Sequence, residues 1–167
     1  PLERVWDGTG GLNGFTIADD GYLYGPQADL GRVIRFDLET KEIEVVADGF
    51  EWPTAVEIDD RGLLYVLDFD GGTVTRVNKE TGEKTQLASL ESGLDNMAIG
   101  PPGHVHANKL YVSSIGGNGI YEIDTATDTL RTVVAGDLTA PGGVATLGTG
   151  TDTRIYIADM FSLREIN

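Results

Sequence analysis

The chain has 167 residues, 40% of them hydrophobic, which is enough for one domain with a sizeable core. Twelve basic against 27 acidic side chains give a net charge of -15, and a field of this sign repels nucleic acid and anionic lipid and favours cations. Cysteine is absent and no apolar run approaches the roughly 18 residues of a membrane helix, so we expect no disulfide, no thiol chemistry, no nucleic acid and no membrane partner.

The chain begins with a short segment that has the character of a strand. Residues 2–6 read LERVW and are followed by Asp7-Gly8. Further along, Val45-Val46-Ala47 is followed by Asp48-Gly49 in the same way. We therefore predict an outer strand over residues 2–6.

Four repeated units follow, at residues 12–49, 52–89, 94–136 and 140–167. Equivalent tyrosines lie at Tyr24, Tyr65, Tyr111 and Tyr156, separated by 41, 46 and 45 residues. Short runs rich in Val, Ile, Leu and Tyr alternate with turn sequences such as Asp-Asp-Gly and Glu-Thr-Gly, and no stretch has a helical period. A period of about 40–45 residues with four strands per unit predicts an all-β chain, a β-propeller of four-stranded blades.

The number of blades leaves two arrangements open. The strand at residues 2–6 could complete the last unit and close a small ring, or the chain could be an excerpt of a six-bladed ring, which is the arrangement we favour. An open excerpt exposes blade faces and strand edges, so it predicts self-association through them.

Strand order predicts which residues share a site. Neighbouring strands of a blade are antiparallel, so the start of the first strand and the end of the second lie at one end of the blade. Near the axis this end would carry Asn13, Asp95 and Asn96, whose oxygens suit calcium or magnesium better than zinc. We predict a divalent cation, with calcium expected, held by these three residues.

Two carboxylates at the same end are candidates for the general base, Asp68 and Asp159. Every candidate also has a structural explanation. Asn13 precedes a glycine, an Asx turn would account for the Asp95-Asn96 pair, and Asp68 flanks a hairpin turn. Both interpretations stay open.

The opposite end of the blades carries other polar residues. Asp19-Asp20 and Asp59-Asp60 lie in turns there and are expected to be structural. His104 and His106 lie in an insertion at the same end; a solvated loop is the favoured interpretation, and a weak peripheral metal site is the alternative.

Several phrases carry a family resemblance: Leu12-Asn13-Gly14, residues 23–27, residues 93–98 and residues 157–165. They resemble the superfamily of gluconolactonase, regucalcin (senescence marker protein) and luciferin-regenerating enzyme, over essentially the whole chain. The resemblance implies a six-bladed ring with one divalent cation in its channel, held by Asn and Asp side chains and a Glu. The Asp95-Asn96 pair matches a pair in the related paraoxonases, and Asn13 matches a recurrent ligand position.

The chain also departs from that pattern. Thr54 and Gly142 stand where further ligands would be expected, and the glutamate has no match, Glu51 being only nearby.

Two functions and an inactive alternative follow. The first is a metal-dependent hydrolase of lactones or related cyclic esters, in which a cation polarises the carbonyl and a carboxylate activates water. The second is a non-catalytic propeller that binds a small molecule or a protein partner, favoured by the ligand-poor second and fourth units. The third is an inactive propeller fragment. Turnover, binding without turnover, and mass in solution would separate them.

Overall fold

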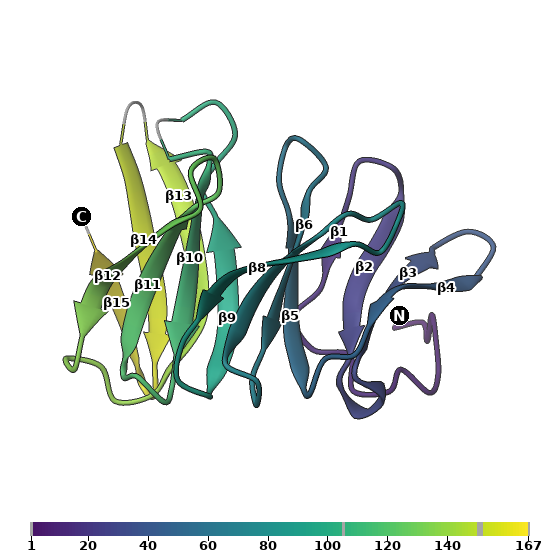
Figure 1. Cartoon of the computed structure of the whole chain (residues 1–167), viewed down its shortest axis with the longest axis horizontal. Coiled ribbons are helices and arrows are strands. Elements are labelled where there is room, and N and C mark those ends of the chain that lie inside the picture. Colours follow the sequence, from purple (N-terminus) through teal and green to yellow (C-terminus); the bar gives the residue numbers. More distant parts are fainter. Residues whose placement is uncertain (1, 105, 150–151, 167) are drawn as a thin grey trace.

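The computed structural model describes residues 2–104, 106–149 and 152–166, which form four antiparallel sheets standing side by side (Figure 1). Blade 1 comprises β1 (Thr16–Ile17), β2 (Tyr22–Gln27), β3 (Arg32–Asp37) and β4 (Ile43–Asp48). Blade 2 comprises β5 (Pro53–Ile58), β6 (Leu64–Asp68), β7 (Thr73–Val77) and β8 (Lys84–Ser89). Blade 3 comprises β9 (Leu94–Ile99), β10 (Lys109–Ser114), β11 (Gly119–Asp124) and β12 (Thr129–Ala135). Blade 4 has three strands, β13 (Pro141–Thr149), β14 (Asp152–Asp159) and β15 (Ser162–Ile166).

The strands confirm the predicted all-β fold built from repeated blades. In each sheet the strands follow one another in chain order, and each repeated unit of the sequence contains one sheet. A single turn of 3-10 helix, η1 (Ala28–Leu30), follows β2. Within the described part of the chain, no helix is long and apolar enough to cross a membrane.

Tight hairpins join the strands because glycines occupy positions that other residues rarely adopt. Gly72, between β6 and β7, has a φ of 61°, and a Cβ at this position would lie 2.4 Å from the carbonyl oxygen of Leu90. The amide of Leu90 in turn donates to the oxygen of Gly72 over 2.8 Å. The turn between β6 and β7 therefore packs directly against the chain that leaves β8.

The hydrophobic core lies between successive blades rather than in one central mass. One buried cluster joins blades 1 and 2, a second joins blades 2 and 3, and a third joins blades 3 and 4. Each contains the repeated tyrosine of the earlier blade, Tyr24, Tyr65 or Tyr111, and all three are buried. The tyrosine repeat of the sequence is thus a repeat of blade junctions.

Residues 2–6 do not form the outer strand predicted from their sequence. They lie beside blade 1, where the ring of Trp6 stacks on Phe36 with 4.9 Å between centroids. Leu12 packs into the same cluster, in the space that a side chain at Gly25 would fill. The outward face of blade 1 is apolar, so covering it removes apolar surface from water.

The ring is not closed by the two ends of the chain. The N-terminal segment and the C-terminal strand lie at opposite ends of the row of blades (Figure 1). Across the three described ranges, β15 pairs with β14 and has no fourth strand beside it. The described chain is therefore an open arc, and the interpretation as a closed four-bladed ring is wrong.

Candidate functional site

The first strands of the blades form the inner edge of the arc. β5 contacts β9, and β9 contacts β13. Each of these three strands contains a one-residue bulge near its start, where the register with the second strand shifts. The bulges place Thr54, the Asp95-Asn96 pair and the Gly142-Gly143 pair at equivalent positions. A bulge turns side chains away from the ladder, and such positions often adjoin functional sites.

Hydrogen bonds link these positions from blade to blade. The amide of Gly14 donates to the oxygen of Thr54 (2.8 Å), and Thr54 Oγ1 donates to the oxygen of Leu94 (3.0 Å). Asn13 and Asp95 therefore lie at the same end of the molecule although 82 positions separate them in the sequence. We call this end, where the bulges lie, the axial end.

Asp95 is the carboxylate of interest at the axial end. Its side chain is half-buried and lies beside Gly142, where a Cβ would be 3.3 Å from Oδ2. Burial raises the pKa of Asp95 above its ordinary value. Among the described residues, no hydrogen bond or ion pair to this carboxylate offsets that burial. A half-buried carboxylate of this kind gains most from a cation or a ligand donor.

The two predicted amide ligands differ in how firmly they are held. Ser113 Oγ accepts from the amide of Asn96 (3.0 Å) and donates to the oxygen of Gly142 (2.6 Å), which fixes the backbone of the β9 bulge against blade 4. Asn96 itself is half-buried, whereas Asn13 is exposed. Blade 3 therefore presents a fixed pair, and blade 1 a freer amide.

These donors fit a hard cation in kind but not in number. Calcium takes six to eight oxygens, and carboxylates and amide carbonyls are its usual protein ligands. Asp95, Asn96 and Asn13 offer one carboxylate and two amide oxygens, and Thr54 Oγ1 is already engaged with Leu94. Over residues 2–104, 106–149 and 152–166, no cluster of three or more His, Cys, Asp or Glu side chains could hold a metal. Water or a ligand would have to complete the shell.

Asp68 lies at the end of β6, where backbone amides already occupy its carboxylate. Oδ2 accepts from the amide of Glu51 (2.7 Å), and Oδ1 accepts from the amides of Trp52 (2.8 Å) and Gly71 (3.1 Å). The side chain is buried and fastens the loop that enters β5 to the turn that leaves β6. These bonds favour a structural role over that of a general base.

Asp159 repeats this arrangement in blade 4. Oδ1 accepts from the amides of Thr139 (2.8 Å) and Ala140 (2.9 Å), and Arg164 Nε donates to Oδ2 (2.9 Å). The amide of Ala140, with that of Thr139 and the Arg164 guanidinium, holds the pKa of Asp159 below its ordinary value. A carboxylate so stabilised in its charged form is a weak base, which again favours structure over catalysis.

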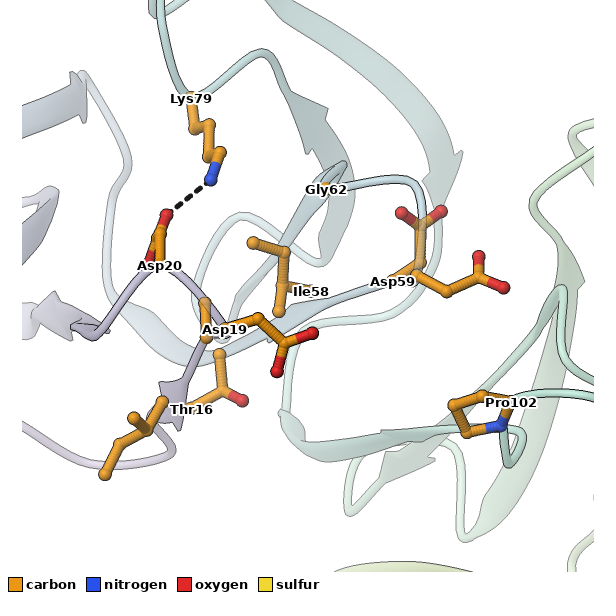
Figure 2. Close-up of a pocket in the computed structure, with 11 residues that line it drawn as sticks. Thr16, Asp19, Asp20, Ile58, Asp59, Gly62, Lys79 and Pro102 are labelled. Atoms are coloured by element: carbon orange, nitrogen blue, oxygen red, sulfur yellow. Dashed lines mark hydrogen bonds and ion pairs between the residues drawn. The ribbon is translucent and has the colours of Figure 1, made fainter.

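The opposite end of the blades contains a cleft of about 470 Å³ between the turns of blades 1 and 2 (Figure 2). Asp19, Asp20 and Asp59 line it, and Lys79 Nζ pairs with Asp20 over 2.5 Å. Asp20 also accepts from the hydroxyl of buried Tyr24 (2.8 Å). This contact agrees with the structural role expected of the turn carboxylates.

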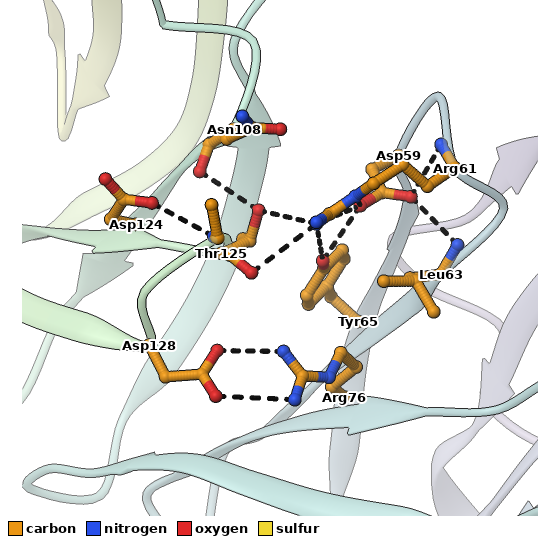
Figure 3. Close-up of polar contacts among 10 residues, drawn as sticks. Asp59, Arg61, Leu63, Tyr65, Arg76, Asn108, Asp124, Thr125 and Asp128 are labelled. Atoms are coloured by element: carbon orange, nitrogen blue, oxygen red, sulfur yellow. Dashed lines mark hydrogen bonds and ion pairs between the residues drawn. The ribbon is translucent and has the colours of Figure 1, made fainter.

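Asp59 belongs to a polar network that joins blades 2 and 3 (Figure 3). Its Oδ2 accepts from Arg61 Nη2 (2.6 Å) and from the hydroxyl of Tyr65 (3.0 Å). Arg61 Nη2 also donates to Thr125 Oγ1 of the next blade (3.0 Å). Nearby, Arg76 Nη1 donates to Oδ1 of Asp128 over 2.8 Å. The network satisfies a buried tyrosine and fastens two blades together.

Two polar residues have environments that the sequence analysis did not predict. His106 Nδ1 lies 2.6 Å from the hydroxyl of Tyr111, so it serves blade 3 as Asp20 and Asp59 serve blades 1 and 2. Glu57, on β5, is largely buried, and burial raises its pKa to about 7. The signal for Glu57 was a single charge inside the apolar run Ala55–Ile58.

Comparisons with known proteins define the fold. No family model and no curated protein matches the chain. Among solved structures, catalytically inactive virginiamycin B lyase from Staphylococcus aureus with quinupristin is 16% identical, with a TM-score of 0.74 over 93% of this chain and 55% of that one. A nidogen/laminin complex matches at 13% identity and a TM-score of 0.78, over 90% of this chain and 57% of that one. Hydrazine synthase of Kuenenia stuttgartiensis matches at 20% identity and 0.70, over 99% of this chain and 51% of that one.

These likenesses establish a β-propeller fold and nothing finer. The chain spans about half the length of the solved structures that it matches. Identities of 13–20% do not transfer a ligand or an activity. The resemblance to the gluconolactonase and regucalcin superfamily stays a prediction.

Proposed function

We propose that this protein is a propeller segment that binds a small molecule and a divalent cation, with calcium expected, at its axial end. Asp95 and Asn96 of blade 3 and Asn13 of blade 1 are the proposed ligands. The observation that carries the proposal is the half-buried Asp95 carboxylate, presented by a bulge and lacking a described partner. The net charge of -15 favours a cation there as well.

The proposal is tested by calorimetric titration of the whole chain with calcium and with magnesium. With one carboxylate and two amides as protein ligands, we expect a weak site, with a Kd on the order of 10⁻⁴ to 10⁻³ M. Asp95→Asn removes the charge but keeps the shape, and should weaken calcium binding by about tenfold or more.

Asp60→Asn is the matched control, because it makes the same charge change at the opposite end of the blades. It should leave the calcium Kd within about twofold. Equal losses in both variants would mean that calcium responds only to overall charge. No measurable heat with the unsubstituted protein would reject the proposed cation site.

Hydrolysis of lactones or related cyclic esters is the second candidate, and it rests on the same site. A bound cation would polarise the ester carbonyl. Asp95 is the carboxylate at the axial end whose oxygens are not committed to backbone amides, unlike Asp68 and Asp159. Its raised pKa favours taking up a proton more than the lowered pKa of Asp159 does.

Lactone hydrolysis measured with and without calcium tests this candidate. Calcium-dependent turnover is expected, and Asp95→Ala should reduce kcat/KM by about 10²-fold or more. Equal rates in the two proteins would remove Asp95 from the reaction. Calcium binding without turnover would leave the binding function and reject the hydrolase.

A further inference from the structure

The two faces of each blade differ, and every junction in the arc joins unlike faces. We call the side that carries the repeated tyrosine the tyrosine face, and the opposite side the aliphatic face. Tyr24 of blade 1 packs with Leu64, Val66 and Val77 of blade 2. The same pattern recurs between blades 2 and 3 and between blades 3 and 4. The chain thus makes the same kind of contact three times.

Blade 4 leaves its tyrosine face uncovered. Leu163 pairs with Ala158, two residues after the repeated tyrosine, so its equivalents in the earlier blades are Val33, Val74 and Ile120. Those three side chains are 0% exposed because the following blade covers them, whereas Leu163 is 75% exposed. Leu147, on the same face, is also exposed. The difference measures a missing neighbour.

Blade 1 leaves part of its aliphatic face uncovered. Thr16 pairs with Tyr24 as Glu57 pairs with Tyr65, so Phe15 is the equivalent of Val56. Val56 is 2% exposed and Phe15 is 51% exposed. Ile17, two residues on, is exposed as well. Trp6 and Leu12 cover the middle of this face, but its inner strand remains bare.

Residues 2–6 connect these two observations. They precede β1 as the outer strand β4 precedes β5, and they carry the same type of sequence. Blade 4 lacks an outer strand beside β15 throughout the described part of the chain. A blade 1 placed against the tyrosine face of blade 4 would bring its own residues 2–6 to that open edge.

We propose that a second copy of this chain docks head-to-tail, with its blade 1 against the tyrosine face of blade 4 and its residues 2–6 paired with β15. One partner then supplies both the missing face and the missing strand. The contact repeats a junction that the chain already makes, and strand pairing at an open edge adds backbone hydrogen bonds. Residues 2–6 leave Phe36 when they pair, and the docked blade takes their place.

Cysteine cross-linking tests the geometry, and the absence of native cysteine makes it clean. Within the chain, β2 packs on β5, β6 on β9 and β10 on β13. By equivalence, β14 of one copy should pack near Phe15 of the next. Ala158→Cys mixed with Phe15→Cys should therefore form a disulfide-linked dimer under mild oxidation, because both positions are exposed in the single chain.

Each single-cysteine variant alone should cross-link at least about tenfold less, because a heterologous contact does not bring a residue opposite itself. Ile115→Cys, in the exposed turn after β10, replaces Ala158→Cys in the control mixture. Equal cross-linking in the self-mixtures or in the control mixture would overturn the proposed geometry.

Sedimentation equilibrium tests the association itself. The average mass should rise above the 17.9 kDa of one chain as concentration rises. Leu163→Asp places a charge on the tyrosine face and should weaken association by about tenfold or more, whereas Ile115→Asp should not. A mass of one chain up to about 1 mM would overturn the proposal, since such weak contact (Kd above about 1 mM) is worth no more than about 4 kcal/mol.

The strand-pairing part has its own variant, Val5→Pro. Val5 is exposed and makes no described backbone hydrogen bond, so the proline should leave the Tm of the single chain unchanged. It removes an amide from the intermolecular ladder and should weaken association by about tenfold. Unchanged association with Val5→Pro would reject the pairing of residues 2–6 with β15.

Discussion

Glu57 combines a buried position with a charge that nothing nearby neutralises. It pairs with Tyr65 across the β5–β6 ladder, and burial raises its pKa from 4.5 to about 7. A carboxyl group whose pKa is higher in the folded than in the unfolded protein binds protons more tightly when folded. Its contribution to the free energy of unfolding is therefore present below pH 4.5, declines as pH rises towards 7, and is lost above it.

Glu57→Gln should accordingly stabilise the protein at alkaline pH and not at acidic pH. The expected gain in the free energy of unfolding is about 1–3 kcal/mol at pH 8 and close to zero at pH 4. Urea denaturation at both pH values measures it. Glu83→Gln removes the same charge from an exposed turn and should show no such pH-dependent gain; a similar gain there would assign the effect to net charge.

Gly14 is required by the close approach of blades 1 and 2. A Cβ at this position would lie 2.9 Å from Cβ of Ala55 and 3.2 Å from the oxygen of Thr54. Gly14→Ala should therefore force the two inner strands apart and cost about 1–3 kcal/mol of stability. Thermal unfolding measures the loss.

Gly143→Ala is the matched substitution at the start of another inner strand. A Cβ there would lie 3.9 Å from Cβ of Ala158, an ordinary contact, so its effect should stay within about 0.5 kcal/mol. If both substitutions were equally costly, lost glycine flexibility rather than the contact with Ala55 would be the cause.

At the scale of strands and loops, the end of each second strand anchors the loop that enters the same blade. Asp68 does so in blade 2 by accepting from three backbone amides. Asp68→Ala leaves buried amides without an acceptor and should lower the free energy of unfolding by about 3 kcal/mol. Asp70→Ala, in the exposed part of the same turn, should change it by less than about 0.5 kcal/mol.

The same pair of variants bears on catalysis. If Asp68 only anchors the loop, kcat of any lactone hydrolysis should fall no further than the folded fraction does. A loss of kcat in fully folded Asp68→Ala, with KM unchanged, would restore Asp68 as a general base.

The strands were predictable because each one alternates side chains between two blades and ends at a turn sequence. Tyrosine spacing and Asp-Gly or Thr-Gly turns are local signals, and they were sufficient to place the four sheets. Residues 2–6 have the same local signal but no neighbouring strand to pair with, so tertiary context overrides it. A sequence pattern describes a strand's own preferences and not the presence of its partner.

The candidate site was predictable only in outline. Asp95 and Asn13 could be assigned to one end from strand direction, because that follows from topology. The partners of Asp68 and Asp159 could not, since backbone amides leave no mark in a sequence. The role of His106 was hidden for a related reason, because its partner Tyr111 is buried by a different blade's packing.

At the scale of the whole molecule, stability is distributed over three similar junctions between neighbouring blades. Each blade contacts its neighbours, and the clusters do not merge into a single core. Such arrays depend on their terminal units being covered. In this chain the N-terminal segment covers one end in part, and blade 4 is bare.

The bare end and the acidity of the chain act against each other when two copies meet. Each copy carries a net charge of -15, so docking brings like charges together, and the repulsion is screened within about 8 Å at 0.15 M salt. Raising sodium chloride from about 0.05 M to about 0.5 M should strengthen the association seen by sedimentation. Weakening with salt would show that attraction between opposite charges, and not apolar contact, holds the copies together.

The exposed Leu163 surface would then behave as an adhesive whose setting is governed by the medium. In dilute electrolyte the chains would remain dispersed, protected by their mutual repulsion. In brine the same chains would join end to end without any change in their own conformation beyond the release of residues 2–6.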